Sequence, residues 1–253
     1  MSVLDLFRLD GRVVIVTGAS SGLGVSFAQG FAEAGADLVL GARRVDRMSQ
    51  TAALVEQAGA RVCTHQTDVT DPEQCQQLVD FAMVEFGRVD VLINNAGVGT
   101  AVPSTRETAE EFRAVIDVNL NGSYWMAQAC GRVMKPGSAI INIASVLGLT
   151  TGGLPQAAYS ASKGGIVGMT LPIARDLSRN GIRNMTIAPG IFGTPMMFGM
   201  PKEVQDSLAA SVPFPSRLGT PQDYAKLAVH IFENDMLNGE VIRLDGAIRL
   251  APR

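Results

Sequence analysis

The chain has 253 residues, of which 47% are hydrophobic and 18% are charged, a balance typical of a packed globular domain and not of a disordered chain. The net charge of -3 gives no electrostatic reason to expect a nucleic acid or an anionic membrane as a partner. The acidic start, MSVLDLFRLDG, does not resemble a signal or transit peptide, and no apolar run reaches the roughly 20 residues of a spanning helix. We therefore expect a single cytoplasmic domain over residues 1–253.

The cysteines and histidines do not form a pattern of metal ligands. Cys63, Cys75 and Cys130 lack a C-x-x-C spacing, and the only histidines are His65 and His230. The sequence thus predicts reduced structural thiols and no metal site.

Apolar runs rich in β-formers alternate with amphipathic stretches along the whole chain, which is the pattern of a parallel sheet covered by helices on both faces. Several runs are nearly continuous, as expected of strands that are buried on both faces. The predicted strands are Arg12–Thr17, Asp37–Ala42, Arg61–Gln66, Val89–Asn94, Ala139–Ala144, Ile182–Ala188 and Glu240–Leu244. The predicted helices are Leu23–Ala34, Asp46–Ala58, Pro72–Phe86, Ala109–Met134, Ala157–Asn180 and Pro221–Glu233. The sequence therefore predicts an α/β fold with a doubly wound, seven-stranded parallel sheet.

A glycine-rich turn follows the first predicted strand and opens a helix. It reads Thr17-Gly18-Ala19-Ser20-Ser21-Gly22-Leu23-Gly24, a G-x-x-x-G-x-G spacing that differs from the usual G-x-G-x-x-G. Glycines permit a tight turn and close backbone approach, while the free amides and the dipole of a helix N-terminus favour a pyrophosphate. A purely structural turn is the alternative, but the position between strand and helix favours a dinucleotide cofactor.

The second predicted strand ends without the acidic residue that usually binds the ribose of NAD. Ala42 is followed instead by Arg43 and Arg44. A guanidinium such as that of Arg43 can pair bidentately with a 2′-phosphate, although both arginines could also be solvated charges at a helix start. The sequence favours NADP over NAD as the cofactor.

A tyrosine and a lysine lie one helical turn apart, at Tyr159 and Lys163. An ordinary tyrosine, with a pKa of about 10, is a poor base near neutral pH, and a neighbouring cation would lower that pKa. Such a pair is common on protein surfaces, so the interpretation depends on the other motifs.

The segment 190–218 is rich in Pro, Met, Phe and Gly and matches no strand of the pattern. A loop of this length is usually functional, and we expect an active-site lid. Met196 and Met197, with Leu154 and Gln156 before the tyrosine, would line a mostly apolar substrate pocket. Packing of part of this set against the body of the protein is the alternative.

These motifs occur in the order found in the short-chain dehydrogenase/reductase superfamily, which the chain resembles over nearly all of its length. The matching motifs are the turn at Gly18, Asn94-Asn95-Ala96-Gly97, Asn119, Ser145, and Tyr159 with Lys163. The resemblance implies a Rossmann-type fold and an NAD(P)-dependent oxidoreductase that interconverts a secondary alcohol and a ketone without a metal.

The resemblance also implies residue roles. Ser145 would hydrogen-bond the substrate oxygen, and Tyr159 would exchange its proton. Lys163 would lower the pKa of Tyr159 and bind the nicotinamide ribose, while Asn119 would hold a water of a proton relay. Asp68 would lie near the adenine. The other implied cofactor contacts are Gly18, Ser20, Ser21, Gly22, Leu23, Gly24, Val69, Asn95, Ala96, Gly97, Pro189, Gly190, Phe192 and Thr194.

The C-terminal half looks most like the type 2 3-hydroxyacyl-CoA dehydrogenases, through residues 156–177, 212–219 and 238–249. That family oxidises hydroxysteroids and branched acyl-CoA thioesters with NAD, so NAD remains an alternative cofactor and an apolar or acyl-thioester substrate is implied. The leading hypothesis is therefore an enzyme of the 3-hydroxyacyl-CoA or alcohol dehydrogenase type. The arginine pair suggests a second, an NADPH-dependent 3-oxoacyl reductase or other ketoreductase. A non-catalytic cofactor-binding regulator on the same fold is the third hypothesis. Family members commonly associate through the helices predicted at Ala109–Met134 and Ala157–Asn180, so a homotetramer is expected.

Overall fold

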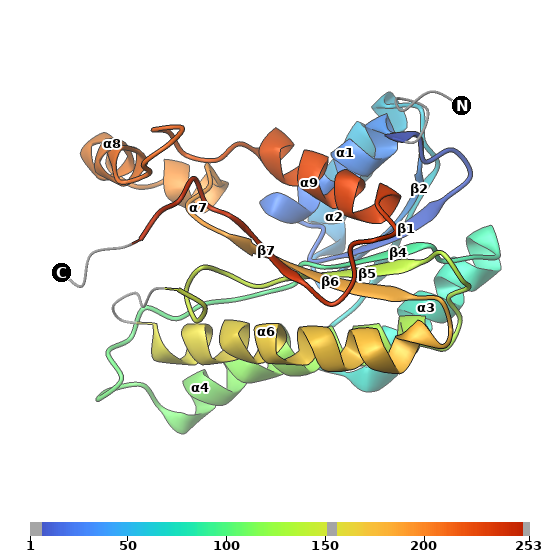
Figure 1. Cartoon of the computed structure of the whole chain (residues 1–253), viewed down its shortest axis with the longest axis horizontal. Coiled ribbons are helices and arrows are strands. Elements are labelled where there is room, and N and C mark those ends of the chain that lie inside the picture. Colours follow the sequence, from blue (N-terminus) through green and yellow to red (C-terminus); the bar gives the residue numbers. More distant parts are fainter. Residues whose placement is uncertain (1–6, 151–155, 250–253) are drawn as a thin grey trace.

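The computed structural model describes residues 7–150 and 156–249, in which seven strands form one parallel sheet (Figure 1). The strands are β1 Val13–Thr17, β2 Asp37–Ala42, β3 Val62–Gln66, β4 Val91–Asn94, β5 Ala139–Ile143, β6 Arg183–Pro189 and β7 Val241–Leu244. Their order across the sheet is β3-β2-β1-β4-β5-β6-β7. The predicted single-domain Rossmann-type fold is confirmed.

The central strands are buried on both faces because helices cover the sheet from either side. Every residue of β1, β4 and β5 is buried, and Val and Ile, which favour the pleated conformation, predominate in them. The strand order reverses between β1 and β4, which is where open α/β sheets form a ligand crevice at the carboxyl ends of the strands.

Helices α1, α2 and α9 cover one face of the sheet, and α3, α4, α5 and α6 cover the other (Figure 1). Their bounds are α1 Leu23–Glu33, α2 Val45–Gln57, α3 Pro72–Phe86, α4 Ala109–Ile116, α5 Gly122–Gly131, α6 Ala157–Ser178, α7 Pro195–Phe198, α8 Lys202–Ala210 and α9 Pro221–Glu233. Each face has its own apolar core, so the sheet is held firmly where its carboxyl edge must support a site.

Two expectations about helices are wrong in detail. The stretch predicted as one helix, Ala109–Met134, is divided by a π-helical segment, η2, at Asp117–Asn121 between α4 and α5. The segment 190–218, expected to be a loop, contains the helices α7 and α8. No residue of α8 is fully buried, and the Pro, Met, Phe and Gly residues around it give the segment the composition of a loop.

Buried asparagines connect neighbouring strands on the α5–α6 face. Asn94 Nδ2 donates to Asn142 Oδ1 at 2.9 Å, and Asn142 Nδ2 donates to Asn184 Oδ1 at 2.9 Å. Asn184 Nδ2 in turn donates to the Thr170 carbonyl at 2.8 Å, so the network joins β4, β5 and β6 to α6. Because the buried amides have partners, the network fixes the register of the strands that carry the site.

The cysteines are free thiols, and burial raises the pKa of Cys63 to about 11 and that of Cys75 to about 12. Within the described residues no group of His, Cys, Asp and Glu has the arrangement of a metal site. The helices of the described part are also too short or too polar to cross a membrane.

Candidate active site

The glycine-rich turn between β1 and α1 is a close-packed cradle with free backbone amides. Gly18 has φ 65°, and a Cβ there would lie 2.8 Å from Ala96 Cα, so only glycine fits. A Cβ at Gly24 would lie 2.8 Å from Asn95 Nδ2. The N-cap residue of α1, Gly22, makes no side-chain cap, so the first amides of the helix remain available to an anion. These features fit the pyrophosphate of a dinucleotide.

Asn95 and Thr17 hold the turn against the end of β4. The Thr17 hydroxyl accepts hydrogen bonds from the amides of Asn95 and Ala96, each at 3.1 Å, and donates to the Ile93 carbonyl at 3.2 Å. Asn95 Nδ2 donates to the carbonyls of Thr17 at 3.0 Å and Gly18 at 3.3 Å. The predicted cofactor residues around Gly18 and Asn95 therefore form one connected unit, to which Thr17, missed by the sequence analysis, belongs.

The two arginines after β2 point to different places. Arg44 Nη2 donates to the hydroxyls of Ser20 at 3.0 Å and Ser21 at 2.9 Å, so its guanidinium lies against the glycine-rich turn. Arg43 lines a cavity of about 410 Å³ together with Gln66, Asp68, Gln74 and Gln77. Sequence reasoning selected Arg43 for the 2′-phosphate, yet Arg44 is the arginine that contacts the turn. Adjacent residues of a chain that leaves a strand tend to face opposite ways, so the sequence could have indicated that Arg43 and Arg44 have different neighbours.

The predicted adenine-side residues are only partly exposed to that cavity. Asp68 lines it, and its carboxylate accepts from the Thr70 amide at 3.1 Å and the Thr70 hydroxyl at 2.9 Å. Val69 is buried against α5, where a Cβ on Gly122 would meet Val69 Cγ2 at 2.7 Å.

Tyr159 and Lys163 lie one turn apart on α6 and face the end of β5. Lys163 Nζ lies 5.7 Å from the centre of the Tyr159 ring and donates to the Ile143 carbonyl at 2.6 Å. Ser145 follows directly after β5, is nearly buried and hydrogen-bonds with the Tyr159 hydroxyl. The structure therefore brings Ser145, Tyr159 and Lys163 together as the sequence predicts.

Burial governs the ionisation of both groups. It raises the pKa of Tyr159 from its ordinary value, and the hydrogen bond with Ser145 opposes this only in part. Burial lowers the pKa of Lys163 to about 8. The expectation that Lys163 lowers the pKa of Tyr159 stays a prediction.

Asn119 lies within η2 and is completely buried. Its Oδ1 accepts from the Val98 amide at 2.8 Å, and its Nδ2 donates to the Val98 carbonyl at 2.9 Å and to Ser162 Oγ at 2.9 Å. Ser162 Oγ donates to the Tyr159 carbonyl at 2.7 Å, which links Asn119 to α6. Sequence reasoning missed Ser162, although its position three residues after Tyr159 puts both on one helical face. The water-holding role of Asn119 stays a prediction.

The residues after β6 connect the site to the segment 190–218. The Val146 amide donates to the Pro189 carbonyl at 3.0 Å, and the Gly190 amide donates to the Leu244 carbonyl at 2.9 Å. The ring of Phe192 is buried against Tyr224, so its predicted cofactor contact is left to its backbone. The Thr194 hydroxyl accepts from the Met197 amide at 3.4 Å, at the start of α7.

Of the predicted substrate residues, Leu154 lies outside the described part of the chain, and the side chain of Met196 is likewise not described. Gln156 precedes α6, and Met197 lies in α7; both are partly exposed. Their contact with a substrate stays a prediction.

Comparison with known proteins identifies the family. The family model described as short chain dehydrogenase matches residues 12–204. The chain belongs to the short-chain dehydrogenases. It is therefore an NAD(P)-dependent oxidoreductase with a Rossmann-type domain, as the sequence predicts.

Several relatives of this short-chain dehydrogenase share its whole length. It is 45% identical to "3-hydroxyacyl-CoA dehydrogenase type-2" of Homo sapiens, covering 96% of this chain and 97% of the relative. It is 32% identical to a 3-oxoacyl-acyl-carrier-protein reductase of Thermotoga maritima, covering 95% and 99%.

Solved structures of other short-chain dehydrogenases have the same fold as this chain. A putative short-chain alcohol dehydrogenase from Sinorhizobium meliloti 1021 matches with a TM-score of 0.90 and 35% identity, over 95% of this chain and 97% of the other. A short chain dehydrogenase from Burkholderia cenocepacia J2315, described in complex with NADP, matches with a TM-score of 0.87 and 30% identity, over 94% and 98%.

Proposed function

We propose that this short-chain dehydrogenase interconverts 3-hydroxyacyl and 3-oxoacyl thioesters, with Tyr159 as the acid/base and NADP as the favoured cofactor. The observation that carries the proposal is the convergence of Ser145, Tyr159 and Lys163 at the edge of the sheet that also bears the glycine-rich turn. When bound, the nicotinamide supplies or accepts the hydride, so the chain has to orient the substrate and handle a proton.

Tyr159 is the group that gives or takes the proton at the substrate oxygen. Burial raises its pKa, so near neutral pH the side chain is a phenol and can donate to the oxygen of a ketone being reduced. Ser145, which already hydrogen-bonds with Tyr159, would hold the same oxygen. In the oxidative direction the phenolate would be the base, and oxidation should therefore speed up as the pH rises.

Lys163 would position Tyr159, and Asn119 would help to restore its proton after each turnover. Below a pH of about 8 Lys163 is an ammonium, and it would bind the nicotinamide ribose while bound to the Ile143 carbonyl. Asn119 connects the Val98 segment to Ser162, at the buried end of the site, where we assign the proton relay.

The substrate class rests on relatives rather than on contacts. The relative from Homo sapiens is named a 3-hydroxyacyl-CoA dehydrogenase and that from Thermotoga maritima a 3-oxoacyl reductase, which describe the same carbon centre in opposite directions. The substrate segment 190–218 presents Phe198 and Met200 as exposed apolar side chains, which suits an acyl chain.

The cofactor preference is supported by the two arginines after β2 and the lack of a carboxylate there. Arg44 beside Ser20 and Ser21, and Arg43 in the cavity of Asp68, would flank a 2′-phosphate. NAD is the alternative.

The test is a rate measurement from the absorbance of the reduced nicotinamide. Acetoacetyl-CoA with NADPH or NADH, and 3-hydroxybutyryl-CoA with NADP or NAD, should both turn over, with a panel of hydroxysteroids for comparison. Turnover of steroids but of neither thioester would contradict the proposed substrate, and faster turnover with NAD than with NADP would contradict the proposed cofactor.

We also propose that the protein is a homotetramer that associates through α4, α5 and α6. Phe112, Tyr124 and Leu171 on these helices are each at least 40% exposed and would supply apolar contacts to another chain. Location in the cytoplasm stays a prediction of the sequence.

A further inference from the structure

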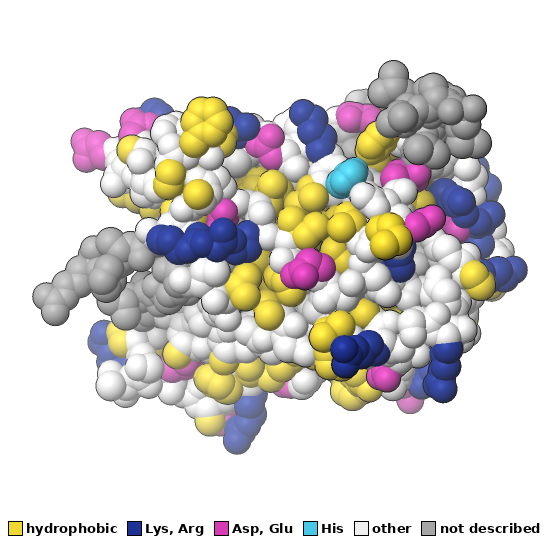
Figure 2. Space-filling view, viewed as in Figure 1, with side chains coloured by type: hydrophobic (Ala, Val, Ile, Leu, Met, Phe, Trp, Pro, Cys, Tyr) yellow, Lys and Arg dark blue, Asp and Glu magenta, His cyan; other side chains and the backbone are white. Residues whose placement is uncertain are grey.

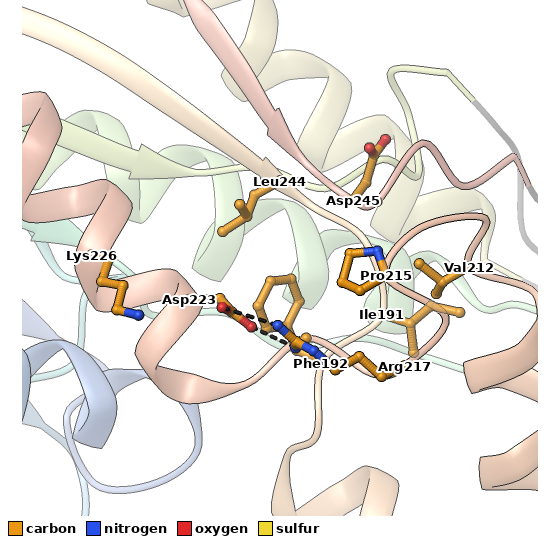
Figure 3. A pocket seen from close by; sticks show the side chains of 11 residues that line it. Ile191, Phe192, Val212, Pro215, Arg217, Asp223, Lys226, Leu244 and Asp245 are labelled. Carbon is orange, nitrogen blue, oxygen red and sulfur yellow. Dashed lines mark hydrogen bonds and ion pairs between the residues drawn. The ribbon is translucent and has the colours of Figure 1, made fainter.

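A second cavity, of about 210 Å³, is lined in part by residues of α9 (Figure 3). This helix covers the face of the sheet opposite to α6, the helix that carries Tyr159 (Figure 1). We propose that this cavity, called here the α9 cavity, binds a small amphipathic carboxylate: an alkyl body between its apolar walls and an anionic head on Lys226. This inference does not depend on the proposed reaction.

The walls of the α9 cavity are mainly aliphatic and aromatic. Ile191 and Phe192, Val212 and Pro215, and Leu244 line it from three segments of the chain (Figure 3). Apolar side chains gather on this face of the molecule over α9 and β7 (Figure 2). The volume is below the range of about 300–1,000 Å³ that drug-sized ligands occupy, so the ligand is a small one. Apolar walls favour an alkyl group over a sugar or a free inorganic ion.

The backbone around the cavity is already tied together. The Gly193 amide donates to the Gly219 carbonyl at 2.9 Å, and the Gly219 amide donates to the Ile191 carbonyl at 2.9 Å. The ring of Phe192 stacks edge-to-face on Tyr224 at 4.7 Å between centroids. Because these contacts hold the wall in place, binding requires little rearrangement of it.

The acidic side chains of the cavity are committed to other partners. Asp223 accepts from Arg217 Nη1 at 2.7 Å and from the Thr220 hydroxyl at 2.8 Å, and the Arg217 guanidinium holds the pKa of that carboxyl well below its usual range (Figure 3). Asp245 accepts from the Ala247 amide at 2.9 Å and lies 3.4 Å from Arg249 Nη1. Each carboxylate thus has an arginine partner within the chain.

Lys226 is the cation that remains for a ligand. Its ammonium has no ion-pair or hydrogen-bond partner among residues 7–150 and 156–249, and its side chain runs from α9 toward the rim near Asp223 (Figure 3). Arg217, the other cation of the lining, is already paired. An apolar pocket with one uncommitted positive charge at its rim is complementary to a carboxylate that bears a short alkyl chain.

The experiment is a titration of the full-length protein with hexanoate, followed by methyl NMR of Ile, Leu and Val groups. The methyls of Ile191, Val212 and Leu244 should shift saturably. Lys226→Met should raise the apparent Kd about fivefold, the range expected for loss of one partly exposed ion pair. Lys202→Met is the matched control, since Lys202 pairs with Asp206 on α8, and it should leave the Kd unchanged.

Three results would overturn the inference. One is the absence of saturable shifts at these three methyls, or shifts confined to residues around Tyr159. Another is equal binding of hexanoate by the wild-type and Lys226→Met proteins, or equal binding of hexanoate and 1-hexanol, since either would remove the role of the charge. The third is that the same methyls respond to protein concentration and not to hexanoate, which would make the α9 cavity a contact between copies of the chain.

Discussion

Arg43 and Arg44 lie on two sides of the proposed 2′-phosphate site and have different neighbours. The two arginines can therefore be substituted one at a time. Arg43→Ala and Arg44→Ala should each raise the Kd of NADPH at least about tenfold with little effect on NADH, because only NADPH loses a charge-assisted contact. Arg47→Ala, in the first turn of α2, is the control for loss of a nearby positive charge. Fluorescence titration measures each Kd, and equal losses for NADPH and NADH would contradict the NADP assignment.

The buried Lys163 makes the free energy of unfolding depend on pH, and the lowered pKa of its ammonium fixes the direction of this dependence. Its pKa falls from 10.5 to about 8 on folding, so the unfolded chain binds more protons than the folded chain between these values. The cost of burying the ammonium is present in full below pH 8 and is relieved as the pH rises above it.

The free energy of unfolding of the wild type, relative to Lys163→Met, should therefore increase from pH 8 to pH 10. Denaturant unfolding at several pH values measures this difference, which cancels the contributions of the other groups. A difference that is constant with pH would mean that Lys163 titrates normally in the folded chain.

At the scale of residues, the sequence indicated which side chains come together at the site, but not which groups they contact. The spacing of Tyr159 and Lys163 and the place of Ser145 follow from local motifs, and all three meet in the structure. The partner of Lys163, the Ile143 carbonyl, is a backbone group on another element, so no side-chain motif reveals it. The raised pKa of Tyr159 depends on burial, which a motif does not contain.

The turn between β1 and α1 allows a prediction with a matched control. Gly18 and Gly22 both have positive φ, but a Cβ at Gly22 would have no neighbour within 4 Å, whereas a Cβ at Gly18 would clash with the Ala96 backbone. Gly22→Ala should cost about 2 kcal/mol of stability, from backbone strain alone, because φ 62° with ψ −135° lies outside the regions that residues with a Cβ adopt. Gly18→Ala should cost more and should also weaken NADPH binding, because the turn cannot move without displacing Ala96.

Denaturant unfolding and NADPH titration of the two variants measure these effects. Equal losses of stability would show that backbone strain, and not the close approach of Ala96, is the reason why position 18 requires glycine.

At the scale of elements, periodicity was sufficient for the strands and insufficient where helices deviate from a regular pattern. The predicted strands agree with the structure to within two residues, since buried runs of Val and Ile have few alternatives. The segment η2 interrupts the helix at Asn119. The sequence did not reveal this interruption, because a π turn shifts the register of a helix without any break in composition. This shift places the Asn119 side chain against Val98, which the regular helix of the prediction did not foresee.

The whole molecule should be a tetramer whose assembly depends on α6. Leu171 is 46% exposed, and Leu171→Glu would bury a charge in the proposed interface. We expect this variant to dissociate to smaller species in light scattering at micromolar concentration. Val84→Glu on α3, where Val84 is 82% exposed, is the control and should remain tetrameric. A monomeric wild type would contradict the proposed assembly.

The central claim is that Tyr159 exchanges the proton at the substrate oxygen, and the turnover of Tyr159→Phe tests it most directly. This variant loses one hydroxyl, so folding and the Kd of NADPH should be preserved while kcat falls about 100-fold or more. Tyr124→Phe on α5 is the matched control, because it removes the same hydroxyl from a residue that the proposed reaction does not use, and it should keep wild-type turnover. Near-wild-type kcat in a folded Tyr159→Phe protein would contradict the account.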